Sequence, residues 1–407
     1  MRVFRLVAVL VVVITCGCSA APPEPPPVAE TTVDPSFVHG TDHGDVDRLA
    51  ATAVTDAQQY WAQQYPALFG TPWRDIDGGF FSVDTAGTGK APPCAADVRD
   101  VEGNAFYCAT VDAIAWDRAA LLPVLREHYG DAAVVVVLAH ELGHAVQARA
   151  GMDVGGAEDA LRMETMADCY SGSFTRWVAD GRAPHLRISA EQLDAAMRAI
   201  TLFRDPVGTT TPEHGTAFDR ISAFQDGFSH GPRRCANLVE AGLTASTAAD
   251  PNQPLDEVLR ADGVASWFGD LVTRRGGRWT PPVRSASCPG KAGPVAFCAP
   301  PPTVTADREA LAGPHHDIGD QAVTTLLASR YAQAALASLG RPADARQIMC
   351  LTGAYTAAQP ELSPGDLDEA VDIMLTSGDV TPTTMTGFDR IAAFRTGAVH
   401  GTTACGL

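Results

Sequence analysis

Apolar residues are most concentrated in one stretch of the first half of the chain. Residues 132–139 read AAVVVVLA, with no polar side chain among them. A helix that is apolar on every side has to be buried. We therefore expect a buried helix over residues 131–149, ended by Gly151 in the usual position after a helix C-terminus.

Weaker periodic patterns predict further elements. The candidates are, in chain order, a helix over Asp45–Tyr65, strands over 80–83 and 106–116, and helices over 158–178, from Ser189 onward and over 218–228. Trp61 and Tyr65 share the apolar face of the first helix. Ser189 and Gln192 form a capping box. The pattern predicts an α+β fold that is rich in helices.

The same patterns occur twice along the chain. FDRISAFQDGFSHGPRRC begins at residue 218, and FDRIAAFRTGAVHGTTAC begins at residue 388. Likewise, GDAAVVVVLAHELGHAVQ from residue 130 matches GDQAVTTLLASRYAQAAL from residue 319, and AFYC at 105–108 matches VAFC at 295–298. A repeat of this kind indicates a duplicated unit. Residues 45–236 and 237–407 are therefore predicted to be two copies of one domain.

The buried helix carries the sequence HELGH at residues 140–144. His140 and His144 are four residues apart and share a face, so both imidazoles can bind one metal ion. Glu141 lies beside the metal but is turned to accept a proton from water. Glu164, in ETMAD at 164–168, is the best candidate for a third ligand. Asp168, one turn later, can accept the other N–H of a ligand histidine. The spacing predicts a Zn²⁺ site of the zincin type.

The alternative is a pair of core histidines that donate to backbone carbonyls. That interpretation leaves Glu141 as a buried, unpaired carboxylate, which is costly. It also leaves the Glu164/Asp168 pair unexplained. The metal site is the better hypothesis.

The second copy lacks every residue of the proposed site. The aligned pairs are His140 with Ser329, Glu141 with Arg330, His144 with Gln333, Glu164 with Ala345, and Asp168 with Met349. Scaffold residues persist, including Arg220 as Arg390 and His230 as His400, and these are expected to be structural. We predict one zinc ion per chain and a degenerate C-terminal domain.

His214 also disappears from the second copy, where Thr384 aligns with it. It lies in a loop before the helix at 218–228. A hydrogen-bond donor near the metal would stabilise the oxyanion of a tetrahedral transition state, so His214 is a second catalytic candidate beside Glu141. The alternative is an ordinary exposed loop histidine.

Charge and cysteine content narrow the class of protein. The net charge of −18 argues against nucleic acid and anionic membrane surfaces as partners.

Eight cysteines lie outside the N-terminal region, four in each copy, and four cysteines permit three connectivities. We favour Cys94–Cys108, Cys169–Cys235, Cys288–Cys298 and Cys350–Cys405 as disulfides. A zinc–cysteine site is the rival interpretation, but no CxxC pair occurs outside the first 18 residues.

The N-terminus is typical of an exported protein. Arg2 and Arg5 precede a short apolar run, and small residues precede Cys18, so residues 1–18 are predicted to be a signal peptide with a lipobox. Cys18 would then carry lipid that anchors the protein to the outer face of a bacterial cell membrane. The alternative is ordinary cleavage and secretion. Residues 19–44 are rich in proline and are predicted to be an extended spacer.

Three motifs together resemble the bacterial neutral zinc metallopeptidase family of the YpfJ type. They are AHELGHAVQ, METMADCYSG and EHGTAFDRISAFQDGF, and the segment that ends in AFYC is similar too. The resemblance covers most of residues 90–236. It implies a zincin-like fold, a glutamate as third ligand, which fits Glu164, and peptidase activity. The C-terminal copy departs from the family at each metal position.

The predicted function is hydrolysis of peptide bonds by zinc-activated water at the bacterial cell envelope, with a peptide or protein as substrate. Two alternatives remain open. One is a non-catalytic envelope scaffold with structural zinc, although such sites have four protein ligands and only three are found here. The other is hydrolysis of peptidoglycan amides, for which no wall-binding module is recognisable. A protein partner of the C-terminal copy is not identified.

Overall fold

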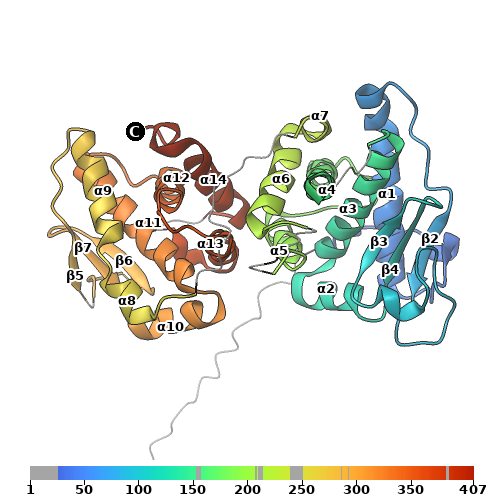
Figure 1. The fold of residues 1–407 in the computed structure, drawn as a ribbon, viewed down its shortest axis with the longest axis horizontal. Helices are drawn as coiled ribbons and strands as arrows, with labels where there is room; N and C mark the ends of the chain where they lie inside the picture. The colour runs from blue at the N-terminus through green and yellow to red at the C-terminus, as the bar shows by residue number, and fades with distance from the viewer. Residues whose placement is uncertain are drawn as a thin grey trace, which may run out of the picture.

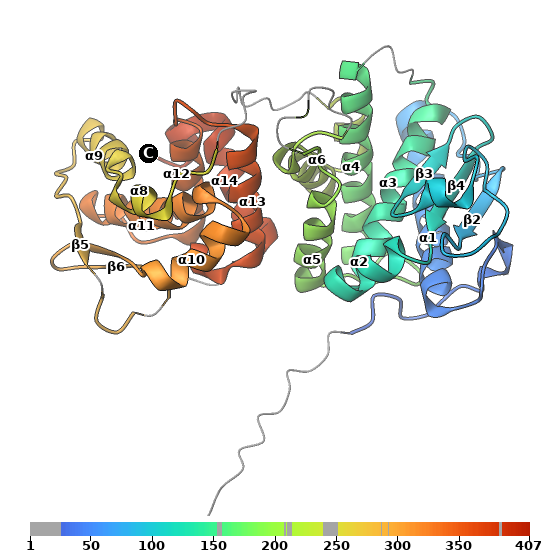
Figure 2. The same ribbon diagram turned by 60° about the horizontal axis from the view of Figure 1, so that its bottom comes forward.

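The structure is a computed structural model. It describes residues 26–152, 157–206, 209, 214–238, 251–285, 287–291, 293–381 and 385–407. These residues form a helix-rich α+β protein with two small sheets. Figures 1 and 2 show an N-terminal half and a C-terminal half side by side, with α5 and α6 facing α13 and α14 between them.

The elements of the N-terminal half are β1 (Val38–His39), α1 (Asp45–Phe69), β2 (Gly79–Val83), β3 (Ala105–Cys108), β4 (Ala113–Asp117), α2 (Leu121–Tyr129), α3 (Asp131–Arg149), α4 (Ala157–Ala179), α5 (Ala190–Thr201), α6 (Ala217–His230) and α7 (Pro232–Cys235). The sheet order is β1-β2-β4-β3, and only β3 is antiparallel to its neighbour. The helix predicted at 131–149 is α3, and its apolar run is buried between α1, α4, α5 and β3.

The elements of the C-terminal half are α8 (Leu255–Arg260), α9 (Gly263–Arg274), β5 (Val283–Ser285), β6 (Val295–Cys298), β7 (Thr303–Ala306), α10 (Arg308–Asp317), α11 (Asp320–Ser338), α12 (Ala345–Thr356), α13 (Pro364–Thr376) and α14 (Gly387–Ala404). Short 3₁₀ turns lie at Pro35–Phe37, Val98–Val101 and Gly378–Val380. The sheet order is β5-β7-β6, again with one antiparallel pair.

Helices of the two halves cross in the same way. In the N-terminal half, a Cβ on Gly172 or Gly227 would lie 2.0 Å from the Phe224 carbonyl oxygen or 1.7 Å from that of Cys169. In the C-terminal half, a Cβ on Gly353 or Gly397 would lie 1.9 Å from the Phe394 carbonyl oxygen or 1.7 Å from that of Cys350. Only glycine permits backbones to approach this closely. The pairs α4–α6 and α12–α14 therefore share one packing geometry.

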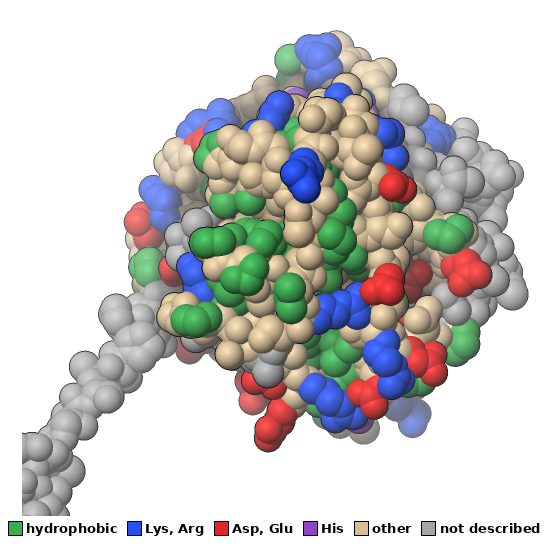
Figure 3. Space-filling model, turned by 90° about the vertical axis from the view of Figure 1, so that its left-hand side faces the viewer, with side chains coloured by type: hydrophobic (Ala, Val, Ile, Leu, Met, Phe, Trp, Pro, Cys, Tyr) green, Lys and Arg blue, Asp and Glu red, His purple; other side chains and the backbone are tan. Residues whose placement is uncertain are grey.

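The two sheets differ at one edge. In the N-terminal half β1 pairs with β2, whereas the described part of the C-terminal half has no strand outside β5. Val283 on that edge is 56% exposed. Figure 3 views this end of the molecule, where hydrophobic side chains gather in the middle of the face and charged ones lie around them, at its upper, left and right sides as well as at its lower edge.

Two predictions of local structure are wrong. The single strand predicted over residues 106–116 is a hairpin, β3 and β4, with a turn whose last residue, Asp112, has a φ of 56°. Aspartate tolerates this left-handed conformation in turns. The apolar and polar alternation continues across the turn, which is why the pattern looked like one strand.

The second wrong prediction is the extended spacer at residues 19–44, because its described part packs against the N-terminal half. Val28 is 1% exposed, and its carbonyl accepts from the backbone N–H of Arg187 at 2.7 Å. The backbone N–H of Val33 donates to Thr52 at 2.9 Å. From Pro26 onward this segment packs on the N-terminal half because it carries apolar residues that the half can bury. Residues 1–25, with Cys18, lie outside the described residues.

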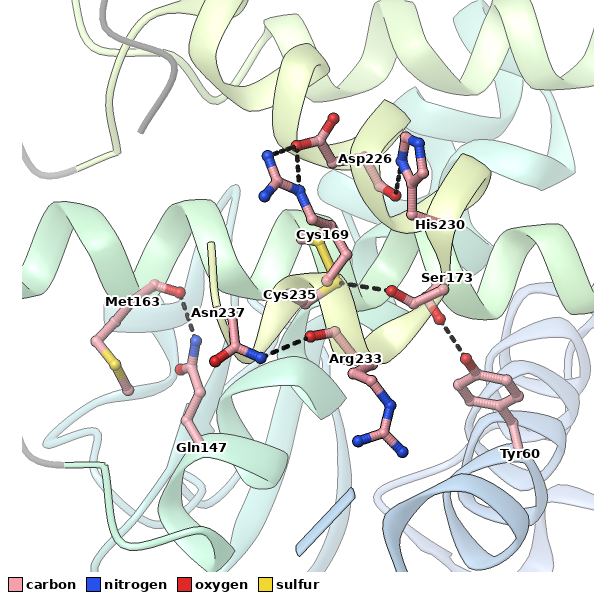
Figure 4. The surroundings of a disulfide bond; sticks show 12 residues. Tyr60, Gln147, Met163, Cys169, Ser173, Asp226, His230, Arg233, Cys235 and Asn237 are labelled. Carbon is pink, nitrogen blue, oxygen red and sulfur yellow. Dashed lines mark hydrogen bonds and ion pairs between the residues drawn. A yellow bond between two sulfur atoms is a disulfide. The ribbon is translucent and has the colours of Figure 1, made fainter. Parts of the chain in front are cut away.

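All four predicted disulfides are present: Cys94–Cys108, Cys169–Cys235, Cys288–Cys298 and Cys350–Cys405. Four disulfides indicate an oxidising environment. Cys169–Cys235 ties α4 to the end of α7, close to the α4–α6 crossing (Figure 4). None of the helices in the described ranges combines the length and apolar character of a membrane crossing.

Candidate metal centre

The three predicted ligands meet at one point. Nε2 of His140 lies 3.1 Å from Nε2 of His144, and Oε2 and Oε1 of Glu164 lie 3.2 Å and 3.3 Å from these two nitrogens. Zn²⁺ bonds of about 2.0–2.1 Å in a tetrahedron place ligand atoms about 3.3 Å apart. Each separation in the structure is close to that value, with one oxygen of Glu164 beside each histidine.

A close helix contact brings Glu164 to the histidines. His140 and His144 lie one turn apart on α3, and Glu164 lies on α4. Between the two histidines, Gly143 packs against Ala167, whose Cα would be 2.9 Å from a Cβ at position 143. The glycine of HELGH therefore permits the approach of α4 that completes the ligand set.

Hydrogen bonds set the tautomers of both histidines. Nδ1 of His140 lies 2.8 Å from Oδ1 of Asp168, and Nδ1 of His144 lies 2.9 Å from Oε1 of Gln147. Both oxygens can only accept, so each Nδ1 donates. In the neutral imidazoles, each Nε2 then carries a lone pair directed at the other and at Glu164. Three acceptors without a donor among them form a site for a cation.

The carboxylates around His140 favour positive charge. Burial opposes protonation of His140, but Asp168 and Glu164 outweigh it and raise its pKa to about 10. Burial also disfavours the charged form of Glu164. When a histidine ring is protonated instead of bound to metal, its Nε2 donates to Glu164, and these hydrogen bonds hold the pKa of Glu164 well below its usual value. The same potential that would hold a proton on His140 would attract a metal cation.

Asp168, predicted to orient a ligand histidine, contacts Nδ1 of His140 and is itself held by Arg220. Nε and Nη2 of Arg220 donate to Asp168 at 2.7 Å and 2.9 Å, and Nη1 donates to the Phe203 carbonyl at 2.7 Å. Asp168 and Arg220 are 2% and 4% exposed. Burial disfavours the Asp168 carboxylate, but the charge of Arg220 lowers its pKa below the usual value.

Two participants were not recognised from the sequence. Arg220 was expected to be structural only, because Arg390 aligns with it; in fact it also supports His140 through Asp168. Gln147 was missed, although it lies three residues after His144 on the same helix. Its amide donates to the Met163 carbonyl at 2.5 Å (Figure 4), which fixes its oxygen towards His144.

Glu141 is buried beside the ligands but does not belong to the three that converge. It accepts a hydrogen bond from the backbone N–H of Tyr107 in β3. Burial raises its pKa, and the nearby histidines oppose that rise. A carboxylate with a raised pKa is suited to accept and return a proton near neutral pH.

A cavity of about 460 Å³ opens over the site. Its walls include Phe106 and Tyr107 of the edge strand β3, Val137, Met163 and Phe203. The cavity is therefore largely apolar, with Glu141 and the three convergent side chains at its base.

His214 lies at the rim of the same cavity. Its side chain is 46% exposed, its Nδ1 lies 3.7 Å from Oδ1 of Asp205, and its backbone N–H donates to Oδ2 of Asp205 at 3.0 Å. Asp205 thus holds the backbone of the loop on which His214 is presented. Thr384, its aligned residue, lies outside the described residues.

The corresponding place in the C-terminal half holds a cation instead of acidic ligands. Arg330, which aligns with Glu141, is 5% exposed and donates to Ser329 Oγ and to the carbonyls of Val295, Asp379 and Val380. Burial lowers its pKa to about 10. The Arg330 guanidinium links α11 to β6 and to the 3₁₀ turn at Gly378–Val380. Its positive charge opposes binding of a metal ion at this position.

Arg390 has an equivalent of one of the three hydrogen bonds of Arg220. Its Nη1 donates to the Ser377 carbonyl at 2.8 Å, as Arg220 does to Phe203. Its Nε is buried without a hydrogen-bond partner, and Met349 is the residue that aligns with Asp168.

Comparison with protein-family models, with curated proteins and with solved structures finds no match for this chain. The resemblance to the neutral zinc metallopeptidases therefore stays a prediction that rests on the motifs and on the geometry described above.

Proposed function

We propose that the protein is a zinc-dependent peptidase whose metal is held by His140, His144 and Glu164. The observation that carries the proposal is the set of three ligand-atom separations of 3.1–3.3 Å, with Glu141 close by and outside the set. Bound zinc would supply a Lewis acid that polarises the scissile carbonyl and acidifies a water molecule. The three protein ligands leave a fourth position for substrate or water, as in catalytic sites.

The protein's own groups would carry the proton and the substrate. Glu141 would accept the proton of the attacking water and return it to the leaving amine. Strand β3 is at the edge of its sheet and lines the cavity, so an extended peptide could pair with its backbone. Asp168 and Gln147 would keep both Nε2 atoms available as ligands.

We further propose that residues 237–407 are a diverged copy of residues 45–236 without metal. The repeated glycine crossings, the equivalent disulfides and the retained contact of Arg390 support a common origin. Together with the signal-like N-terminus and Cys18, the disulfides support an exported protein of the bacterial envelope. The zincin-like fold and family membership belong to the same proposal.

Metal analysis of the purified chain tests this function. We expect about one zinc per chain, because among the described residues only the N-terminal half brings two histidines and a carboxylate together, the donor set that suits zinc. Glu164→Ala should lose zinc. Glu141→Gln should retain it and lose cleavage of a peptide library. The proposal would be contradicted by two zinc ions per chain, or by a chain that contains no zinc after purification in chelator-free buffer. An active Glu141→Gln variant would also contradict it. Muropeptide digestion without peptide cleavage would favour a peptidoglycan amidase.

A further inference from the structure

The two halves hold each other through a reciprocal pair of aspartates. Asp368 of α13 accepts from the backbone N–H of Phe218, in the first turn of α6, at 3.2 Å. Asp194, at the equivalent place in α5, accepts from Gly387 and Phe388, at the start of α14, at 2.5 Å and 2.8 Å. Each half therefore caps a helix N-terminus of the other half, where backbone N–H groups lack partners within the helix.

One of these two contacts is linked to the metal site through a charged side chain. Helix α6 carries Arg220 two residues after Phe218, and Arg220 holds Asp168. Helix α14 carries Arg390, whose Nε has no partner. The reciprocal contacts are alike in kind, but α6 carries the arginine that holds Asp168. Helix α14 contacts α6 at Gln225 and Asp226, more than one turn beyond Arg220.

Asp368 also contacts the second segment that holds Arg220. Its Oδ2 lies 3.3 Å from Nε of Arg204. The carbonyl of the preceding residue, Phe203, accepts from Arg220 Nη1. The Asp368 carboxylate thus contacts both the first turn of α6, which carries Arg220, and the turn at residues 203–204, which accepts a hydrogen bond from the Arg220 guanidinium.

Three of the side chains between Asp368 and the metal site are buried, and Arg204 is partly exposed. Asp368 is 3% exposed, and Arg220 and Asp168 are equally buried. Charged hydrogen bonds in such surroundings are strong and directional. A shift of Arg220 therefore changes the position of Asp168, and Asp168 sets the orientation of the His140 ring.

We propose that Asp368 of the C-terminal half is a positioning residue for the metal site of the N-terminal half. It acts through α6 and Arg204 on Arg220, Asp168 and His140. The inference rests on the proposed function, in which His140 is a zinc ligand. By this inference the C-terminal half has a role that requires no metal ligands of its own. Its Asp368 helps to position Arg220 and, through Arg220, the residues that hold His140.

Asp368→Ala and Asp194→Ala in the full-length chain form a matched pair, because each removes one cap between the halves. The measurements are zinc affinity by chelator competition, the visible absorption spectrum of the Co²⁺-substituted protein, and the denaturant midpoint. Both variants should unfold at lower denaturant concentration. Asp368→Ala alone should lower zinc affinity about 10-fold, as loss of outer support does at metal sites, and change the Co²⁺ spectrum.

Equal zinc affinities and equal Co²⁺ spectra in the two variants would overturn the inference and leave the proposed function intact. A wild-type chain that binds neither metal would overturn both. If Asp368→Ala does not fold, Asp368→Asn is compared with Asp194→Asn by the same measurements. The asparagine keeps an acceptor for α6 but loses the charge that pairs with Arg204, so the same difference in spectrum and affinity is expected.

Discussion

At the scale of single residues, the state of the two histidines depends on side chains outside the HELGH motif. Asp168 and Gln147 direct both Nδ1 protons away from the metal position, and Arg220 keeps Asp168 charged in a buried place. The motif alone predicts which atoms bind. The surrounding acceptors decide whether those atoms are free to bind.

His214 is the second catalytic candidate, and its role as a hydrogen-bond donor to the oxyanion can be tested by substitution. It lies at the cavity rim, and its backbone is held by Asp205. If its ring donates to the developing oxyanion, His214→Ala should keep zinc and lower kcat by about 10²–10³-fold. Steady-state kinetics with measured zinc content checks this. A change in KM alone, or loss of zinc, would assign His214 another role.

At the scale of elements, the site depends on helices that cross at glycine. Gly143 brings α3 against α4, and Gly227 brings α6 against α4 next to Cys169. These contacts set the distance between Glu164 and the histidines and between Arg220 and Asp168. Substituting any of these glycines would push two backbones apart.

Gly227→Ala and Gly397→Ala test this dependence as a pair. Each new methyl would lie 1.7 Å from a carbonyl oxygen, that of Cys169 or Cys350. Both variants should lose stability, by about 1–3 kcal/mol or more from overpacking. Only Gly227→Ala should also weaken zinc binding, because Asp168 is adjacent to Cys169. Denaturant unfolding and zinc titration measure the two effects; equal zinc affinities would show that α4 adjusts without moving Asp168.

At the scale of the whole molecule, buried acids make stability depend on pH. Glu369 of α13 accepts from the N-terminus of α11. Burial and the neighbouring Asp320 and Asp366 raise its pKa to about 8, from 4.5 in an unfolded chain. The folded state therefore keeps a proton that the unfolded state releases. The contribution of protonated Glu369 to the free energy of unfolding is fully present below about pH 4.5, and it is lost as the pH rises through about 8.

Glu369→Gln should remove this loss, since glutamine does not titrate. The free energy of unfolding of the variant relative to wild type should increase between pH 5 and pH 9, as measured by denaturant unfolding at both values. Glu361→Gln, an exposed residue of the same half, is the control. A constant difference across this range would contradict the assigned pKa of Glu369.

The sequence by itself determined the elements and the chemistry that local patterns carry. The apolar run with HELGH predicted α3 at residues 131–149, where the structure has it. Spacing of four residues placed both histidines on one face, and paired cysteines in each repeat predicted the four disulfides. These features depend on periodicity and residue type, which a sequence states directly.

Only the tertiary structure decided how distant segments support the site. Arg220 looked structural because the repeat retains it, and its contact with Asp168 depends on the α4–α6 crossing. The hairpin turn at Asp112 broke a strand whose alternation continued across it. The contacts of Asp194 and Asp368 join residues more than 140 positions apart. Such contacts arise from packing of whole helices, and no local pattern of apolar and polar residues specifies them.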